Sequence, residues 1–588
     1  MKKVRRILAL MLVCVMAFAI TACGGSNNAN STVSGSNTSG GGSSSPDASS
    51  SGSGESSSPN TGGGGSSGGR DTLTVAINAD SGTMIPGRTN GGQYYAEFCM
   101  YESLWEVDTN GNFIYQLMES YDEPSPGFWR VHLRQGVYFT NGQEMTADDV
   151  MFSLAFWKSI PVNSVRVQSI DPEKTVKVDK YTVDMYMLNG YYYYHDTGSS
   201  MFMIHSSYGY EDLVERINNG DILANEEFAA FEESIATDPV GTGPYKLNEY
   251  MVNSHVFLER RDDYWGEAPD FQFINFRVIS EPAQVANAIT TGVVDIAMID
   301  LADADYIDSL PTHYTVSRYT GGGTGLSFNS GVNGYFNRFY DPEKSLEARF
   351  AVYHAIDPEV FANHVYMGRA IPMHNIIPDF MLDYKPEYDN MHEAYNIGYN
   401  LERAKELAQS SGLAGQTISI MTNGLAQSVL IAEIVQSMLA QIDVTLEIRN
   451  YDPATVNTMV YDPLSDYDIT VGAGIAPNLR VCDLLLNGVR YSATLTILAN
   501  SEGSPTGLPA FPGNDWYLEN CGDMVYESDP VKRVEVTEKC LQMYMDEALG
   551  FGLCVGETVW AMSNDINRDT IAFSVTSGQI FLNQLKWN

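Results

Sequence analysis

The chain has few cations, few cysteines and, beyond its first twenty residues, no long apolar run. Its 588 residues contain 34 lysines and arginines against 73 aspartates and glutamates, which gives a formal net charge of -39. Such an excess of negative charge argues against a phosphate backbone or an anionic membrane surface as a direct partner. We therefore expect no nucleic-acid ligand, and we expect the acidity to favour solubility.

Cysteine is scarce and carries no metal-binding spacing. The seven cysteines include no CxxC pair, so we expect no zinc site and no other metal centre. Cys521 and Cys540 could form a disulfide in an oxidising compartment, but their spacing alone leaves both the bridged and the reduced state open.

Familiar catalytic motifs are also missing. The chain has no HExxH and no Walker loop. A nucleophile-elbow pattern, Gly64 to Gly68, lies in a Gly/Ser-rich stretch that cannot form the strand, turn and helix this chemistry needs. We expect that the chain is not an enzyme and needs no cofactor. A secreted hydrolase is the less favoured alternative.

The N-terminus carries an export signal. Lys2, Lys3, Arg5 and Arg6 precede an apolar stretch from Ile7 to Ile20, too short for a membrane span, and small residues then precede Cys23. This order predicts a lipoprotein signal peptide over residues 1–22, with lipid attached to Cys23. Loss of the four cations would bring the net charge to about -43.

Residues 23–69 are almost wholly Gly, Ser, Asn, Thr and Pro, with Asp47 and Glu55 as the only charges. Such a composition cannot bury enough apolar surface to fold, so it predicts a flexible tether with a typical reach of about 35 to 40 Å. The chain would then be anchored to a membrane through lipid on Cys23.

The remaining residues alternate between strand and helix patterns. Thr72 to Ile77 predicts a strand, Tyr94 to Leu104 a helix, and Trp105–Val107 with Phe113–Tyr115 a hairpin around Asn110-Gly111. Trp129, Val131 and Leu133 then alternate with charged residues, as in a half-buried strand.

A turn at Asn141-Gly142 and an N-cap at Thr146 follow, ahead of a predicted helix from Val150 to Trp157. This strand, turn and helix, over Phe128 to Val150, resembles a signature of the family 5 extracellular solute-binding proteins, the dipeptide and oligopeptide-binding lipoproteins of ABC importers. Further segments resemble the same family in the same order: Pro239–Leu247, Arg261–Pro269, Thr291–Ala297, Gly325–Asn329, Glu347–Glu359 and Tyr399–Ala408.

The resemblance implies an α/β fold of the periplasmic-binding-protein type II, cluster C, with two large lobes joined by a hinge and a smaller inserted lobe. Lobe I would comprise residues 70–115, 238–325 and 556–588, the inserted lobe 116–237, and lobe III 326–555. It further implies a monomer on the outer face of the cytoplasmic membrane. There it would capture a peptide in the interlobe cleft and deliver it to the permease subunits of an ABC transporter.

At the position where peptide-binding members carry Gly-Trp and then an aspartate for the peptide amine, this chain has Gly474, Ile475 and Asn478. A neutral amide cannot supply the charge-assisted bond that an ammonium prefers. Asp468 or Asp483 could replace the acid, although each is expected to be structural. An oligosaccharide, a capped peptide or another polar solute therefore stays open as the ligand, and a ligand-sensing role stays open as the function.

The other candidate ligand contacts are polar and aromatic residues near the expected cleft. For each of them, a role in packing or in a solvated loop would explain the residue type equally well. The tyrosines Tyr191 to Tyr194 are assigned to a strand of the inserted lobe rather than to sugar stacking. The candidates are Ser81, Thr83, Met84, Tyr319, Asn329, Gly474, Asn478, Trp516 and Trp560.

Overall fold

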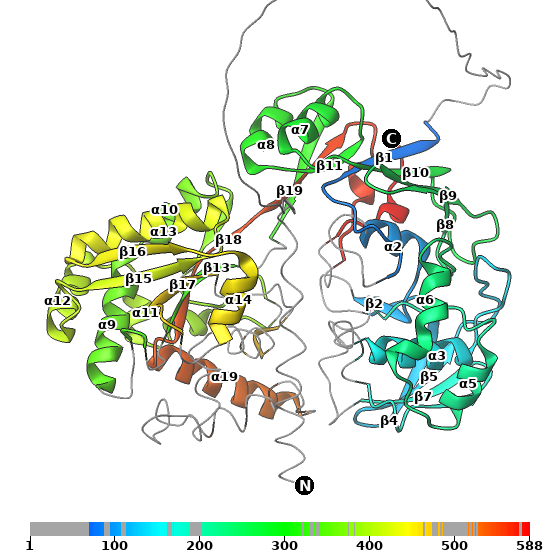
Figure 1. Cartoon of the computed structure of the whole chain (residues 1–588), viewed down its shortest axis with the longest axis horizontal. Helices are drawn as coiled ribbons and strands as arrows, with labels where there is room; N and C mark the ends of the chain where they lie inside the picture. Colours follow the sequence, from blue (N-terminus) through cyan, green and yellow to red (C-terminus); the bar gives the residue numbers. More distant parts are fainter. Residues whose placement is uncertain are drawn as a thin grey trace, which may run out of the picture.

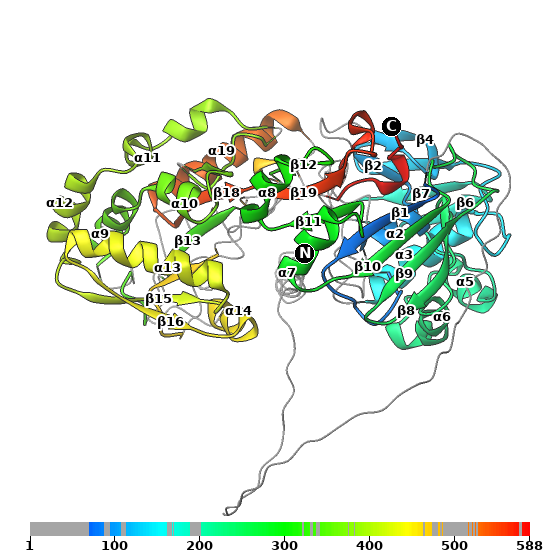
Figure 2. The ribbon, with the colours of Figure 1, turned by 90° about the horizontal axis from the view of Figure 1, so that it is seen from above.

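The structure is a computed structural model of the whole chain (Figures 1 and 2). The residues that it describes are 70–86, 94–107, 113–160, 167, 170–187, 202–319, 323–329, 333–336, 341–373, 375–381, 383–461, 465–472, 480–482, 485, 516, 520, 524, 527, 529–574 and 579–588. No helix within these ranges has the length and apolar character that crossing a bilayer requires.

A seven-stranded sheet gathers strands from distant parts of the chain. β1 lies at its centre and pairs in parallel with β10 and β11, while the outer pairs are antiparallel. In spatial order the strands are β12 (His313–Arg318), β19 (Thr558–Ser563), β11 (Ile296–Ile299), β1 (Thr72–Ile77), β10 (Phe273–Val278), β9 (His255–Arg260) and β8 (Tyr245–Met251). The predicted strand Thr72–Ile77 is confirmed as β1.

Helices cover only part of one face of this sheet. Two helices, α7 (Pro282–Thr290) and α8 (Leu301–Asp308), pack on β11, β19 and β12 through a small apolar cluster that includes Ala297 and Ala561. The opposite face packs against α2 (Tyr94–Met100) and joins the main core through Val75, Phe276 and Met562. Figure 2 shows α7 and α8 beside the strands β10, β9 and β8, over which none of the described helices lies on this face.

The helix expected over Tyr94–Leu104 is four residues shorter than predicted. It ends at Met100 because the next carbonyl groups bond to other segments: Gly243 N donates to Met100 O at 2.9 Å and Ile204 N donates to Glu102 O at 3.0 Å. The hairpin that follows is confirmed, with β2 (Trp105–Val107) antiparallel to β3 (Phe113–Tyr115).

A second, six-stranded sheet lies on the other side of the molecule (Figure 1). Its order is β14 (Ala370–Pro372), β18 (Gly550–Gly556), β13 (Thr324–Phe328), β17 (Ile469–Val471), β15 (Thr417–Thr422) and β16 (Thr445–Asn450). The associated helices are α9 (Pro342–Ala355), α10 (Pro358–His364), α11 (Glu393–Ile397), α12 (Leu401–Ser411), α13 (Ala426–Leu439), α14 (Pro453–Tyr461) and α19 (Pro530–Asp546). Of the segments that resemble the family, Glu347–Glu359 contains the later part of α9 and the start of α10, with a break between the two helices after Ala355. Tyr399–Ala408 contains the N-cap Asn400 and most of α12.

A four-stranded antiparallel sheet forms a smaller unit below α2. It contains β4 (Met118–Ser125), β5 (Phe128–Leu133), β7 (Thr182–Tyr186) and β6 (Val176–Asp179), and it packs with α3 (Ala147–Ser159), α5 (Glu211–Asn218) and α6 (Ala229–Ile235). Thr146 caps α3 as predicted, and the carboxylate of Asp149 completes a capping box. The alternation along β5 is also confirmed, because Trp129, Val131 and Leu133 are buried.

The four described cysteines, Cys99, Cys482, Cys540 and Cys554, are buried. The possible bridge between Cys521 and Cys540 involves Cys521, which lies outside the described residues. Burial raises the pKa of the Cys99 thiol well above its usual value and that of Cys554 to about 12, so both thiols stay protonated and inert at neutral pH.

Two strand connections join the large sheets. The chain passes from β12 in the seven-stranded sheet to β13 in the six-stranded sheet, and it returns from β18 directly to β19. Only Glu557 separates these last two strands. We call the two passages the first and second crossover.

Candidate functional site

The crossovers bring together polar and aromatic side chains from both large sheets. Tyr319 follows β12 at the first crossover and its ring stacks on Phe380, which belongs to the segment after β14, with centroids 6.1 Å apart. Burial and then the negative charge of Glu557 at the second crossover raise the pKa of the Tyr319 hydroxyl. The predicted candidate Tyr319 thus lies where the two sheets meet.

Arg369 forms an ionic bridge between the two sides. It immediately precedes β14 in the six-stranded sheet, yet its guanidinium lies 2.7 Å from an Asp305 oxygen and 3.9 Å from an Asp308 oxygen on α8. It also lies 3.4 Å from a Glu557 oxygen, and Glu557 N donates to Arg369 O at 2.9 Å. Asp305 and Glu557 raise the pKa of Arg369, with the hydrogen bond to Asp305 as the largest cause.

A double-mutant cycle tests this bridge. Because the Asp305 side chain is 91% exposed, we expect Arg369→Gln and Asp305→Asn to couple by only about 0.2 to 1 kcal/mol in urea unfolding. The coupling should shrink in 1 M salt, where charges on the surface are screened. A coupling of zero at low salt would contradict this contact between the two sides.

Beside the crossovers, an aromatic patch covers the end of the seven-stranded sheet on its α2 face. Trp560 on β19 is 3% exposed, its indole N–H donates to the Tyr95 hydroxyl at 3.2 Å, and its ring lies 5.2 Å from Phe573. Arg318, the last residue of β12, places its guanidinium 5.6 Å from the centre of the Phe573 ring. We call Tyr95, Arg318, Trp560 and Phe573 the crossover patch.

Of the candidates after β1, Met84 is fully buried and belongs to the main core. Ser81 and Thr83 are half-buried, and the Thr83 hydroxyl accepts a hydrogen bond from Ile85 N at 3.1 Å, as in a local turn. The described contacts of Met84 are therefore those of core packing, and the described contact of Thr83 is that of a local turn.

Asn329 is 1% exposed and holds together the segment before β17. Its side-chain amide donates to the carbonyl groups of Ser465 and Tyr467 at 3.1 and 2.7 Å. The neighbouring Asp468 accepts hydrogen bonds from Tyr335 N, at 2.6 Å, and from the backbone and hydroxyl of Ser419, at 2.7 and 2.9 Å. Asp468 therefore has the structural contacts expected of it.

Trp516 is half-buried, and the Lys539 ammonium on α19 lies 3.6 Å from the centre of its ring, a cation–π contact.

Several sequence-based candidates lie outside the described residues: Gly474, Asn478, Cys23, Asp483 and the tyrosines from Tyr191 to Tyr194. Among the candidates, the structure therefore places Tyr319 and Trp560 at the crossovers. Sequence reasoning missed Arg318, although a lone cation next to Tyr319 was a visible signal.

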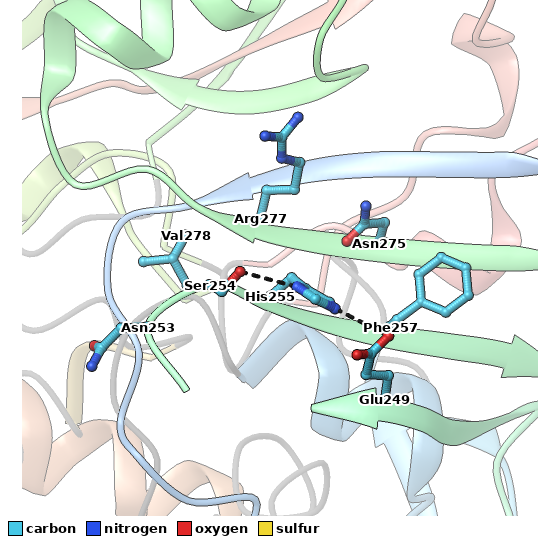
Figure 3. A pocket seen from close by; sticks show the side chains of 8 residues that line it. All are labelled: Glu249, Asn253, Ser254, His255, Phe257, Asn275, Arg277 and Val278. Carbon is cyan, nitrogen blue, oxygen red and sulfur yellow. Dashed lines mark hydrogen bonds and ion pairs between the residues drawn. The ribbon is translucent and has the colours of Figure 1, made fainter. Parts of the chain in front are cut away.

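A separate pocket of about 400 Å³ lies on the uncovered face of the seven-stranded sheet, over β8, β9 and β10 (Figure 3). Ser254 Oγ lies 3.1 Å from His255 Nδ1, and His255 Nε2 lies 3.5 Å from Glu249 Oε2. The latter distance is too long for the hydrogen bond that would orient a catalytic imidazole. The lining residues are Glu249, Asn253, Ser254, His255, Phe257, Asn275, Arg277 and Val278.

No group of three histidine, cysteine or acidic side chains within the described part of the chain could hold a metal ion.

Comparison with known proteins identifies the chain's relatives. It is 26% identical over 370 residues to the nickel-binding protein NikA of Staphylococcus aureus, covering 60% of this chain and 64% of that protein. It is 28% identical over 233 residues to a putative ABC transporter peptide-binding protein of Brucella ovis, covering 38% of this chain and 41% of that protein. The chain thus aligns with less than two thirds of the length of each.

Solved structures share the fold. NikA of Brucella suis in complex with Fe(III)-EDTA matches with a TM-score of 0.70 at 20% identity, covering 88% of this chain and all of that one. The DppA protein of Helicobacter pylori in complex with the peptide STSA matches with a TM-score of 0.62 at 20% identity, covering 88% and 98%. The predicted type II periplasmic-binding-protein fold is therefore confirmed.

The model of one family, described as bacterial extracellular solute-binding proteins, family 5, middle part, matches residues 112–485, which is well over half of the chain. Its members are binding proteins rather than enzymes, as expected from the sequence. The chain belongs to family 5 of the bacterial extracellular solute-binding proteins.

Proposed function

We propose that the chain is the substrate-binding lipoprotein of an ABC importer, which captures a di- or oligopeptide between its two large lobes and delivers it to a membrane permease. The observation that carries the proposal is the family match over residues 112–485, in a chain whose two large sheets are joined by two crossovers. Short crossing segments of this kind act as hinges in proteins that close on a ligand.

The proposed lobes are those expected from the sequence: residues 70–115, 238–325 and 556–588 for lobe I, 116–237 for the inserted lobe, and 326–555 for lobe III. The division is supported by the sheets, since the chain leaves one large sheet after Arg318 and returns to it at Thr558. Ligand that contacts both lobes would stabilise their closed arrangement, which the permease would recognise.

The proposed location is the outer face of the cytoplasmic membrane, with lipid on Cys23 and the Gly/Ser-rich stretch to residue 69 as a tether. The support is the order of cations, apolar run and small residues before Cys23. We propose a monomer, since one chain supplies both faces of the interlobe site.

A second candidate ligand is a metal chelate, which the nickel-binding relative favours. The described residues offer no group of three metal ligands, so the organic part of the chelate would make the protein contacts. A sugar remains the third candidate.

Thermal unfolding of the purified full chain separates these candidates. A ligand present at 100 times its Kd stabilises the folded state by about 2.7 kcal/mol, which raises the unfolding temperature measurably. We expect stabilisation by a di- to pentapeptide mixture and none by a matched panel of oligosaccharides. Stabilisation by sugars alone would overturn the peptide assignment.

A further inference from the structure

Arg369 reaches across the crossovers from the half that contains the six-stranded sheet. Its backbone follows the turn between α10 and β14, where Met367 and Gly368 have left-handed φ values of 56° and 78°. This conformation is uncommon for a side chain as bulky as methionine, so the surroundings must hold it. The turn therefore fixes the point from which the Arg369 side chain extends.

The same turn is fastened to both crossovers. The Tyr366 hydroxyl lies 2.6 Å from Thr324 Oγ1, at the start of β13 where the first crossover ends. The Tyr366 ring covers Gly556, where an added Cβ would lie 2.3 Å from a ring carbon. At the second crossover, Glu557 N donates to Arg369 O at 2.9 Å. The backbone of Arg369 is thus held beside the hinge while its side chain reaches the other half.

The side chain of Arg369 contacts one particular face of the seven-stranded half. Its two carboxylate partners there lie on α8, which packs against Val559 and Ala561 of β19. Side chains alternate between the two faces along a strand, so Trp560 points to the opposite face, where it meets α2. Figure 1 shows α8 above β19 and α2 below it. The ionic bridge of Arg369 and the crossover patch therefore lie on opposite faces of the sheet.

The two faces of a hinge move in opposite senses. When two lobes rotate about short connecting segments, groups on one face approach each other and groups on the other face separate. With the solute held on the face of the crossover patch, closure around it would draw Arg369 away from α8.

We propose that Arg369 sets the affinity for solute without touching it, because its bridge to α8 holds the lobes apart and has to break on closure. The inference rests on the proposed function, and it adds a residue that controls affinity from the far side of the hinge. Any free energy that favours the open arrangement lowers the apparent affinity of a ligand that binds the closed one. A weaker bridge should therefore give tighter binding.

The expected gain is modest, because the Asp305 side chain is 91% exposed and the Asp308 side chain is 44% exposed. Ion pairs with such exposure contribute little, which corresponds to a change of about 2- to 5-fold in affinity. Salt screens charges on the surface, so the gain should shrink in 1 M salt.

The test titrates the full chain by calorimetry with the di- to pentapeptide mixture and, separately, with Fe(III)-EDTA. The total probe concentration at half-saturation is compared between proteins. One variant, Arg369→Gln, removes the charge from one half, and the other, Asp305→Asn, removes its partner from the other half. Asp308 is kept, because its carboxylate also accepts from the backbone and hydroxyl of Thr315, both at 2.7 Å, within its own half.

The matched control is Arg403→Gln, which removes the same charge from a pair with Glu406 that lies wholly within α12. At low salt we expect Arg369→Gln and Asp305→Asn each to lower the half-saturating concentration, Arg369→Gln by about 2- to 5-fold. The double variant should gain no more than the better single variant, because both remove one contact. Arg403→Gln should stay within about 1.5-fold of wild type.

The direction of the change separates the proposal from structural damage, since a distorted hinge would weaken binding. Equal or weaker binding by Arg369→Gln, or a gain that persists in 1 M salt, would overturn the role of Arg369 and leave the proposed function standing. If neither probe binds wild-type protein, the proposed function fails, and the inference that rests on it fails as well.

Discussion

Replacement of Gly241 by alanine is expected to abolish or severely weaken folding. A Cβ atom at this position would lie 2.0 Å from Met100 O and 2.9 Å from Met100 C, and backbone atoms cannot move aside as a flexible side chain can. The same loop is tied by Thr140 N to Gly241 O at 3.0 Å and by Gly243 N to Met100 O at 2.9 Å. Any shift that relieves the clash would break these bonds.

We expect Gly241→Ala to lower the free energy of unfolding by at least about 3 kcal/mol, measured by urea denaturation. The control is Gly292→Ala, where φ is +71° and no atom lies within 4 Å of the added Cβ, so only the backbone conformation is penalised, by about 1 kcal/mol. Similar losses for the two variants would show that the approach of Gly241 to Met100 is not as close as described.

Arg349 is the second position where a single change should have a large effect. It lies on α9 with no exposed surface, and it donates to Glu547 O at 3.1 Å, to Phe336 O at 3.3 Å and to the Ser345 hydroxyl at 2.7 Å. These acceptors belong to the end of α19, to the segment before α9 and to α9 itself. One buried guanidinium therefore links three parts of the six-stranded half.

Arg349→Met keeps much of the volume but leaves these acceptors without their donor, so we expect a loss of about 3 to 5 kcal/mol in unfolding free energy. Arg403→Met on α12 removes a half-exposed arginine paired with Glu406 at 3.1 Å, and it should change stability by no more than about 0.5 kcal/mol. The account of Arg349 is wrong if the two variants unfold at the same urea concentration.

Much of the fold was predictable because local patterns coincide with tertiary burial. The alternation along Phe128–Leu133 and the cap at Thr146 each predicted an element that the structure contains. The end of α2 was not predictable, because the bonds that terminate it come from Gly243 and Ile204, more than a hundred residues away. Sequence neighbours carry no information about such partners.

The candidate site was predicted less well for the same reason. Trp560 and Tyr319 were proposed from their residue types, and the structure places both at the crossovers. Asn329 has equally suitable chemistry, yet its amide is used by the carbonyl groups of Ser465 and Tyr467. The partners of Arg318, Ser574 O and the Phe573 ring, lie about 256 residues away along the chain, so only the three-dimensional arrangement reveals them.

The central claim is that this chain holds a small solute between its lobes, and native mass spectrometry of the full chain purified from rich medium tests it most directly. We predict a bound species in a one-to-one complex, which denaturation releases as a peptide mixture. Protein that carries nothing, and whose mass does not change after incubation with peptides or carboxylate chelates, would contradict the claim.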